Sequence, residues 1–223
     1  MLVKPEASGY FVTGSDTDVG KTYIACQIVQ QLRAAGFEVE TRKPAESGCS
    51  PGPQGELLTH DAAALQRANG ESEPIERITA YRFRAALAPH RAARLEGQTL
   101  LMENLIDACA RDHDDRCLIV EGAGGFYSPL AENGLNADLA GALQLPVIIV
   151  VHDRIGAVNQ ALMTSQAVTS RHLRVAAIIL NQVTPMTNPD MDNAADLQPH
   201  CDLPVLRCAH GAILPPLFGA TNG

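Results

Sequence analysis

The residues best suited to chemistry lie near the amino terminus, in the segment Gly14-Ser15-Asp16-Thr17-Asp18-Val19-Gly20-Lys21-Thr22. An apolar run precedes this segment and a stretch of helical composition follows it, which is the context that a phosphate-binding loop requires. Glycines let backbone N–H groups converge on phosphate oxygens, and a helix N-terminus adds partial positive charge. Lys21 would bridge the terminal phosphates, and Thr22 would place its hydroxyl on Mg²⁺. Five residues separate Gly14 from Gly20, where the common motif has four, so the sequence predicts a lengthened variant of this loop.

Two carboxylates are candidates for the remaining metal ligands of such a loop. Mg²⁺ takes oxygen ligands, usually one or two carboxylates together with nucleotide oxygens and water. Glu121 ends an apolar run, at the carboxyl end of an expected strand, where ligands collect in open α/β sheets. Asp61 begins an expected helix after a loop, a position that an ordinary first-turn acid would also occupy. The predicted metal ligands are therefore Thr22, Asp61 and Glu121.

The elements that must position these residues alternate between strand and helix. Short apolar runs bounded by Gly, Pro, Asn or Asp are expected to be strands: Tyr10–Thr13, Phe37–Arg42, Cys117–Glu121, Val147–His152, Val175–Leu180 and Pro204–Cys208. Segments of helical composition lie between them: Lys21–Ala35, His60–Asn69, Leu100–Arg111, Asn136–Leu143 and Ala157–His172. This alternation is typical of right-handed βαβ units. The expected fold class is α/β, a P-loop NTPase-like sandwich with a mainly parallel central sheet flanked by helices, formed by residues 1–223 as a single domain.

Composition argues against several classes of partner. The formal net charge is −8 and no run of Lys or Arg occurs, so no nucleic-acid partner is expected. The longest apolar run, 145–151, is too short to span a bilayer, and residues 1–9 lack the apolar core of a signal peptide, so no membrane partner is expected. Six cysteines show no C-x-x-C pair and no matching His spacing. Reduced cysteines and a cytoplasmic protein are the expectation.

Further short motifs accompany the phosphate loop along the chain. They are Lys43-Pro44-Ala45-Glu46-Ser47-Gly48-Cys49, Asp61-Ala62-Ala63-Ala64-Leu65, Ala88-Pro89-His90, Val120-Glu121-Gly122-Ala123-Gly124-Gly125, Gly156-Ala157-Val158-Asn159 and Asn181-Gln182-Val183. With these motifs in this order, over residues 10–183, the chain resembles the dethiobiotin synthetase family. The Glu121 motif alone also occurs in related amide-forming P-loop enzymes. Its combination with Lys43-Pro44 and the lengthened loop is much more specific.

The resemblance implies the ATP-dependent carboxylation and ring closure of 7,8-diaminononanoate with CO2 to give dethiobiotin, in biotin biosynthesis. One amine captures CO2 as a carbamate, the carbamate oxygen takes the γ-phosphoryl group of ATP, and the second amine closes the ureido ring and expels phosphate. It also implies Mg²⁺, ATP as co-substrate, and a homodimer with active sites at the subunit interface. Phosphoryl transfer depends on positioning and positive charge, which Lys21, Lys43 and Mg²⁺ would supply.

The resemblance also implies roles for individual residues. The positions that match those touching the diamino acid or its carbamate are Thr17, Lys21, Lys43, Ser47 and Gly124, with Thr17, Lys21 and Lys43 as the catalytic set. The positions expected at the nucleotide are Asp16, Asp18, Val19, Gly20, Lys21, Thr22, Tyr23, Glu121, Asn181 and Pro204. Asn181 matches the residue that reads the adenine edge, a task for which an amide has both donor and acceptor. Asn159 matches a residue that crosses the dimer interface.

Two departures and two rival functions stay open. Asp18 stands where a glutamate is common in the family, and Arg207-Cys208-Ala209-His210-Gly211 replaces the usual adenine loop, so nucleotide specificity is not fixed. One rival is a related ATP-dependent amide-forming ligase, although such enzymes usually carry a glutaminase domain. Another is a partitioning or assembly ATPase that acts as a nucleotide switch. Those switches usually have a second lysine early in the loop, where this chain has Ser15-Asp16.

Overall fold

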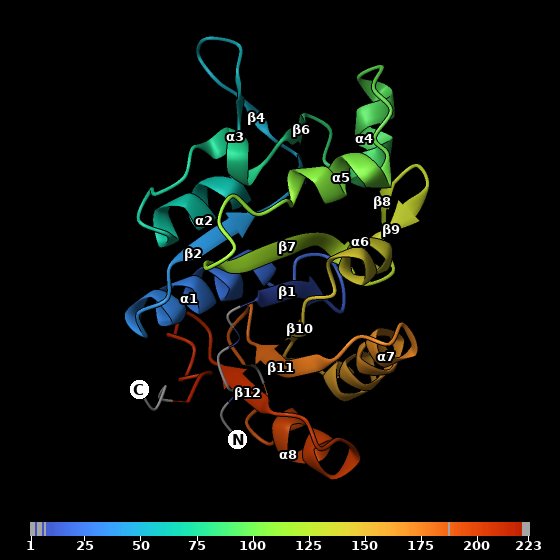
Figure 1. Ribbon diagram of the computed structural model, residues 1–223. Coiled ribbons are helices and arrows are strands. Elements are labelled where there is room, and N and C mark those ends of the chain that lie inside the picture. Colours follow the sequence, from blue (N-terminus) through green and yellow to red (C-terminus); the bar gives the residue numbers. More distant parts are fainter. Residues whose placement is uncertain (1–2, 4–5, 7, 187, 220–223) are drawn as a thin grey trace.

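A six-stranded parallel sheet forms the centre of the protein in a computed structural model that describes residues 3, 6, 8–186 and 188–219 (Figure 1). Its strands in spatial order are β12 (Val205–Cys208), β11 (Val175–Asn181), β10 (Val147–His152), β1 (Gly9–Gly14), β7 (Cys117–Gly125) and β2 (Val39–Arg42). Each neighbouring pair runs parallel. All six carboxyl ends therefore meet at one edge of the sheet, as the sequence predicts for a doubly covered α/β fold.

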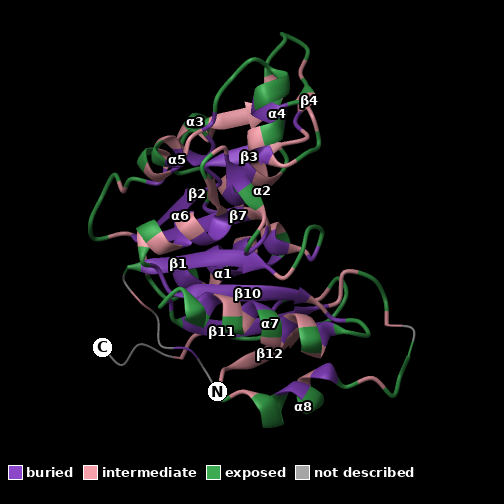
Figure 2. Cartoon of the chain, turned by 90° about the vertical axis from the view of Figure 1, so that its right-hand side faces the viewer, coloured by how far each residue is buried: buried purple, intermediate pink, exposed green. Residues whose placement is uncertain are grey.

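The helices cover both faces of this sheet and bury two separate cores. Alternate strand residues divide between them, as the period of two in a strand requires: Phe11 and Val120 lie in one core, Val12 and Ile119 in the other. The first core packs under α5 (Met102–Ala108), α6 (Asn136–Leu143), α7 (Ala157–Ser170) and α8 (Asn193–Leu197). The second packs under α1 (Lys21–Ala34), α2 (Asp61–Ala68) and α3 (Ile75–Ile78). Figure 2 shows β1, β10 and β11 buried, β12 at the edge of the sheet less so, and the outer helix faces exposed.

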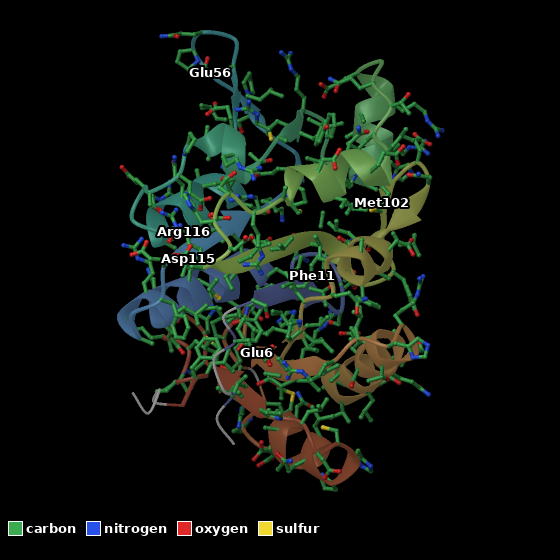
Figure 3. The ribbon with its side chains drawn as sticks, viewed as in Figure 1. Glu6, Phe11, Glu56, Met102, Asp115 and Arg116 are labelled. Atoms are coloured by element: carbon green, nitrogen blue, oxygen red, sulfur yellow. The ribbon has the colours of Figure 1, made fainter. Side chains whose placement is uncertain are left out.

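Smaller elements extend the sheet edge that carries the carboxyl ends. Strand β3 (Ala45–Ser47) pairs in parallel with β6 (Tyr81–Phe83), and α4 (Pro89–Leu95) follows. Two hairpins, β4 (Ser50–Pro51) with β5 (Leu57–Leu58) and β8 (Pro129–Ala131) with β9 (Gly134–Leu135), and a 3₁₀ turn η1 (Gln198–His200) complete the described elements. In Figure 3, Phe11 lies in the interior, whereas Glu56 lies at the tip of the β4–β5 loop.

The strands and helices predicted from the sequence are confirmed, with ends that differ by a few residues. The largest difference is in β7, which continues to Gly125 instead of ending at Glu121. Gly125 pairs with Gly14 of β1, and the buried side chain of Asn136 accepts a hydrogen bond from the Ala123 N–H at 3.0 Å. These contacts keep the glycine-rich segment extended beside the phosphate loop.

Candidate active site

The phosphate loop spans Ser15 to Gly20, between β1 and α1, and is held by hydrogen bonds to β10 and β11. The Ser15 N–H donates to the Val150 carbonyl at 2.9 Å, and the Asn181 amide donates to the Val19 carbonyl at 2.9 Å. Gly20 has a φ of 83°, and a Cβ there would lie 2.2 Å from the Asn181 amide nitrogen. Only glycine fits this left-handed, tightly packed position. The loop is thus fixed before any phosphate arrives.

The side chain of Lys21 extends back to the start of this loop. Its Nζ donates to the Asp16 carbonyl at 3.0 Å, and its side chain is buried. In the described part of the chain, no carboxylate lies within ion-pair distance of Lys21. Burial, aided by repulsion from Lys43, lowers the pKa of Lys21 to about 8. The loop therefore presents a cation whose charge is not yet neutralised.

Lys43, by contrast, is held by two carboxylates. Its Nζ lies 2.6 Å from Glu121 Oε1 and 2.8 Å from Asp61 Oδ2. The Thr22 hydroxyl donates to Glu121 Oε1 at 2.8 Å. The register of β2 against β7, with Arg42 beside Val120, brings Lys43 next to Glu121. The structure thus brings together all the predicted metal ligands and the second lysine.

Burial and charge act in opposite directions on these groups. Burial alone would raise the pKa of Asp61, but attraction to Lys43 and hydrogen bonds from Lys43 and Thr22 hold that pKa below its usual value. Burial likewise opposes the charge of Lys43, yet Glu121 and Asp61 together raise its pKa. Lys43 is therefore a permanent cation at neutral pH. For Glu121, which is fully buried, desolvation outweighs the attraction of Lys43 and raises the pKa.

A pocket of about 560 Å³ connects these groups. The predicted site residues that line it are Thr17, Asp18, Gly20, Lys21, Thr22, Lys43, Ser47, Asp61, Glu121 and Gly124. Gly124 has a φ of 76°, and a Cβ there would lie 2.7 Å from Ser128 Oγ. The apolar residues 86–89 also line it. The pocket therefore combines cationic groups with apolar side chains that suit an aliphatic chain.

Six predicted residues lie outside this pocket, two of which, Val19 and Asn181, are bonded to each other. Asn159 is exposed on α7, and Asp16 is exposed on the phosphate loop, where its carboxylate accepts the Thr17 N–H at 2.7 Å. The Tyr23 hydroxyl donates to the Ala212 carbonyl at 2.7 Å. Pro204 precedes β12, and its carbonyl accepts the Ile178 N–H.

The expectation for Pro204 stays a prediction. Pro204 precedes β12, whose first residue, Val205, lies opposite Ile178 in the middle of β11. Residues 209–212 follow the carboxyl end of β12, and the His210 N–H contacts Gln182 Oε1 at 3.3 Å, directly after Asn181. The rule that ligands gather at carboxyl ends could have selected this segment from the sequence.

The lowered pKa of Lys21 predicts a pH dependence for the binding of metal-free ADP. Phosphate binds the protonated lysine, so affinity should be constant below pH 8 and should fall about tenfold per pH unit above it. Calorimetric titration from about pH 7 to 9.5 measures this slope, and proton uptake should accompany binding near the upper end. The Lys21→Ala variant should show a flat profile. A flat profile for the wild type would remove Lys21 from the phosphate site.

The fold and this site together define a P-loop nucleotide-dependent protein, and comparisons with known proteins agree. A family described as "AAA domain" matches residues 8–216. The crystal structure of the cell division protein FtsY of Thermotoga maritima superposes with a TM-score of 0.52 at 14% identity, covering 97% of this chain and 67% of that one. At this identity the likeness concerns the fold alone. No helix in the described ranges combines the length and apolar character needed to cross a membrane.

Curated relatives identify the particular family. The ATP-dependent dethiobiotin synthetase BioD of Anaeromyxobacter dehalogenans is 43% identical over 85% of this chain and 83% of its own length. Proteins of the same name from Ruthia magnifica and Rhodopirellula baltica are 37% and 35% identical, over 88% and 97% of this chain and 89% and 90% of their own lengths. The chain belongs to the ATP-dependent dethiobiotin synthetase family.

Proposed function

We propose that this protein is an ATP-dependent dethiobiotin synthetase, a single-domain enzyme that closes the ureido ring of dethiobiotin on 7,8-diaminononanoate with CO2. The observation that carries the proposal is the convergence of Lys21, Lys43, Asp61 and Glu121 in a pocket that the apolar residues 86–89 also line. The lysines suit ATP phosphates and a carbamate, and the apolar side chains suit the aliphatic chain of the diamino acid.

The chemical steps assign distinct tasks to the pocket residues. An amine adds to CO2 and loses a proton to give a carbamate, whose oxygen attacks the γ-phosphorus while ADP departs. The second amine then attacks the carbamoyl carbon and loses a proton, and phosphate departs. Lys21 and the loop N–H groups bind the phosphates, and Lys43 stabilises the carbamate and the transferring phosphoryl group. Thr17, Ser47 and Gly124 position the diamine and its carbamate.

The residues around Glu121 also fit a Mg²⁺ ion. Glu121 Oε2 is buried and has no hydrogen-bond partner among the described residues, which leaves an acceptor available beside Thr22 and Asp61. No group of three or more His, Cys, Asp or Glu side chains that could hold a metal occurs in the described ranges. That finding suits Mg²⁺, which takes one or two carboxylates and completes its shell with nucleotide phosphates and water. When bound, the metal would neutralise phosphate charge, held by Thr22, Asp61 and Glu121.

Recognition of the base would use the edge beside Asn181. The side chain of Asn181 holds the phosphate loop through the Val19 carbonyl. Residues 209–212 lie at the same edge, where His210 bonds to Gln182 and Ala212 bonds to Tyr23. We propose that the adenine binds between Asn181 and this segment.

A direct assay separates this function from its rivals. Purified protein would be mixed with diaminononanoate, labelled bicarbonate and MgATP. The expected result is acid-stable label in the product, with one ADP formed per label incorporated. ATP hydrolysis that ignores the diamine but responds to a lipid surface or a partner protein would favour the nucleotide switch. Labelling that requires glutamine would favour an amide-forming ligase.

A homodimer is part of the proposal. Asn159 and Met163 are four residues apart on α7, which places them on one face of this helix, and Ile155 lies in the turn before it. Ile155 is 83% exposed and Met163 62% exposed, so apolar side chains are available at the surface that carries Asn159. Pairing of this face with a second copy would bury them and carry Asn159 toward the partner's pocket.

All six cysteines are free, in keeping with a cytoplasmic enzyme.

Met163→Glu is expected to weaken the dimer at least tenfold, about 1.4 kcal/mol, because it places a charge in an apolar contact. Light scattering across a dilution series measures the change. Leu95→Glu is the matched control, since Leu95 is equally exposed on α4 (67%) but lies off the proposed face. Equal effects of the two substitutions would contradict this interface.

Mixing Lys43→Ala with Asn159→Ala protein should restore about a quarter of native activity if Asn159 acts across the dimer.

A further inference from the structure

Glu46 is a buried carboxylate that the mechanism above does not use. It is 3% exposed and lies in β3 directly before Ser47. Its Oε1 accepts the N–H groups of His60 and Asp61 at 2.5 and 3.0 Å, and its Oε2 accepts the Ala62 N–H at 2.9 Å. Both oxygens are therefore committed to the first turn of α2.

These three N–H groups belong to the set that a helix cannot satisfy internally. The residue in the N-cap position, His60, provides no side-chain cap. Glu46 supplies the cap from a distant strand, and its negative charge also suits the positive end of the helix dipole. The backbone of Asp61 is thereby fixed by a group outside its own helix.

The position of Asp61 matters because its carboxylate lies 2.8 Å from Lys43 and faces the pocket. Glu46 and Ser47 both line the pocket, and the carboxylate of Glu46 is bonded to the first turn of α2. Strand β3 thus connects an expected substrate contact with an expected metal ligand through two adjacent residues.

We propose that Glu46 is a positioning residue that sets Asp61 for the metal and keeps it in register with Ser47. The inference rests on the proposed function, because it assumes that Asp61 binds the metal of a metal–nucleotide complex. Both carboxylate oxygens of Glu46 are occupied by N–H groups of α2, so its expected effect on metal binding passes through Asp61.

Glu73 provides a control, because it supports the other end of the same helix. It is a buried carboxylate, 6% exposed, that accepts the Thr41 N–H at 2.8 Å and the side-chain amide of Asn69 at 3.1 Å. Asn69 is the C-cap residue of α2, so Glu73 supports the end of the helix far from Asp61. A general loss of helix support would appear in both variants.

The test measures Mn²⁺ affinity by electron paramagnetic resonance, in protein saturated with ADP. Glutamine at position 46 keeps the size but cannot accept at both ends, so Glu46→Gln should weaken Mn²⁺ binding about tenfold and leave metal-free ADP affinity within about twofold. Glu73→Gln should lower the melting temperature and leave Mn²⁺ affinity within about twofold. Glu46→Asp, which keeps the charge with a shorter reach, should fall between Glu46→Gln and the wild type.

The double variant decides whether Glu46 acts through Asp61. In an Asp61→Asn background, Glu46→Gln should cause no further loss of Mn²⁺ affinity. Additive losses, or native Mn²⁺ affinity in Glu46→Gln, would overturn the proposal and leave Glu46 a purely structural cap. Native Mn²⁺ affinity in Asp61→Asn would overturn it as well. None of these outcomes depends on product formation, so a failure of the proposed synthetase reaction is recognised separately in the labelling assay.

Discussion

Replacing Lys43 with alanine is expected to lower kcat for ring closure about a hundredfold, about 2.7 kcal/mol of barrier, and to change the KM for ATP by less than about threefold. The reason is that Lys43 contacts Asp61 and Glu121, the proposed metal ligands, and not the phosphate loop, in the resting protein. Its charge therefore matters most when the carbamate and the transferring phosphoryl group add negative charge to the pocket. Steady-state kinetics with saturating diamine measure the split between kcat and KM.

The Lys43→Ala variant needs a control for stability, because removing one partner of a buried ion pair destabilises a protein by about 3–5 kcal/mol. Protonation of Glu121, whose pKa burial already raises, should limit this cost. Circular dichroism at the assay temperature will show whether the variant is folded. Arg174→Ala, which removes an exposed cation at the start of β11, should leave kcat unchanged. A folded Lys43→Ala variant with native kcat would exclude Lys43 from the reaction.

The sequence was sufficient to predict the sheet and the groups at its carboxyl edge. Strands of a buried parallel sheet are short apolar runs, and the residues that follow them must meet at one edge. That rule placed Glu121 near the phosphate loop, and the family resemblance added Lys43 and Asn181, which the structure brings to the same edge. The same rule, applied to β12, would have added residues 209–212.

What the sequence could not provide are contacts between segments that share no periodic pattern. Glu46 bonds to residues 14 to 16 positions away, across the β4–β5 excursion, and nothing local distinguishes it from a solvated acid. Strands β3 and β6 have only three residues each and pair outside the main sheet, so their apolar pattern is too short to read. Helix α4 begins with Pro89 at its first turn, a permitted position that the motif Ala88-Pro89-His90 alone did not reveal.

The two lysines differ in how they are held, and this difference predicts different kinetic consequences. Lys43 is neutralised by Asp61 and Glu121, whereas the Lys21 ammonium bonds to the Asp16 carbonyl and forms no ion pair with a described carboxylate. A nucleotide therefore gains an unpaired cation at Lys21 but must reorganise an existing ion pair at Lys43. We expect Lys21 to determine nucleotide affinity and Lys43 to determine rate.

Replacing Lys21 with alanine is accordingly expected to weaken the binding of ADP about a hundredfold, about 2.7 kcal/mol, and to abolish measurable turnover. Calorimetry gives the affinity, and the labelling assay gives the rate. Gly20→Ala is a companion variant without a change in charge: a Cβ at Gly20 would displace the Asn181 amide and distort the loop, so it too should lose affinity. Lys21→Ala should differ in keeping its affinity constant above pH 8, where the wild type weakens. Native ADP affinity in Lys21→Ala would show that phosphate binds elsewhere, because no other buried cation of the described chain lies on the phosphate loop.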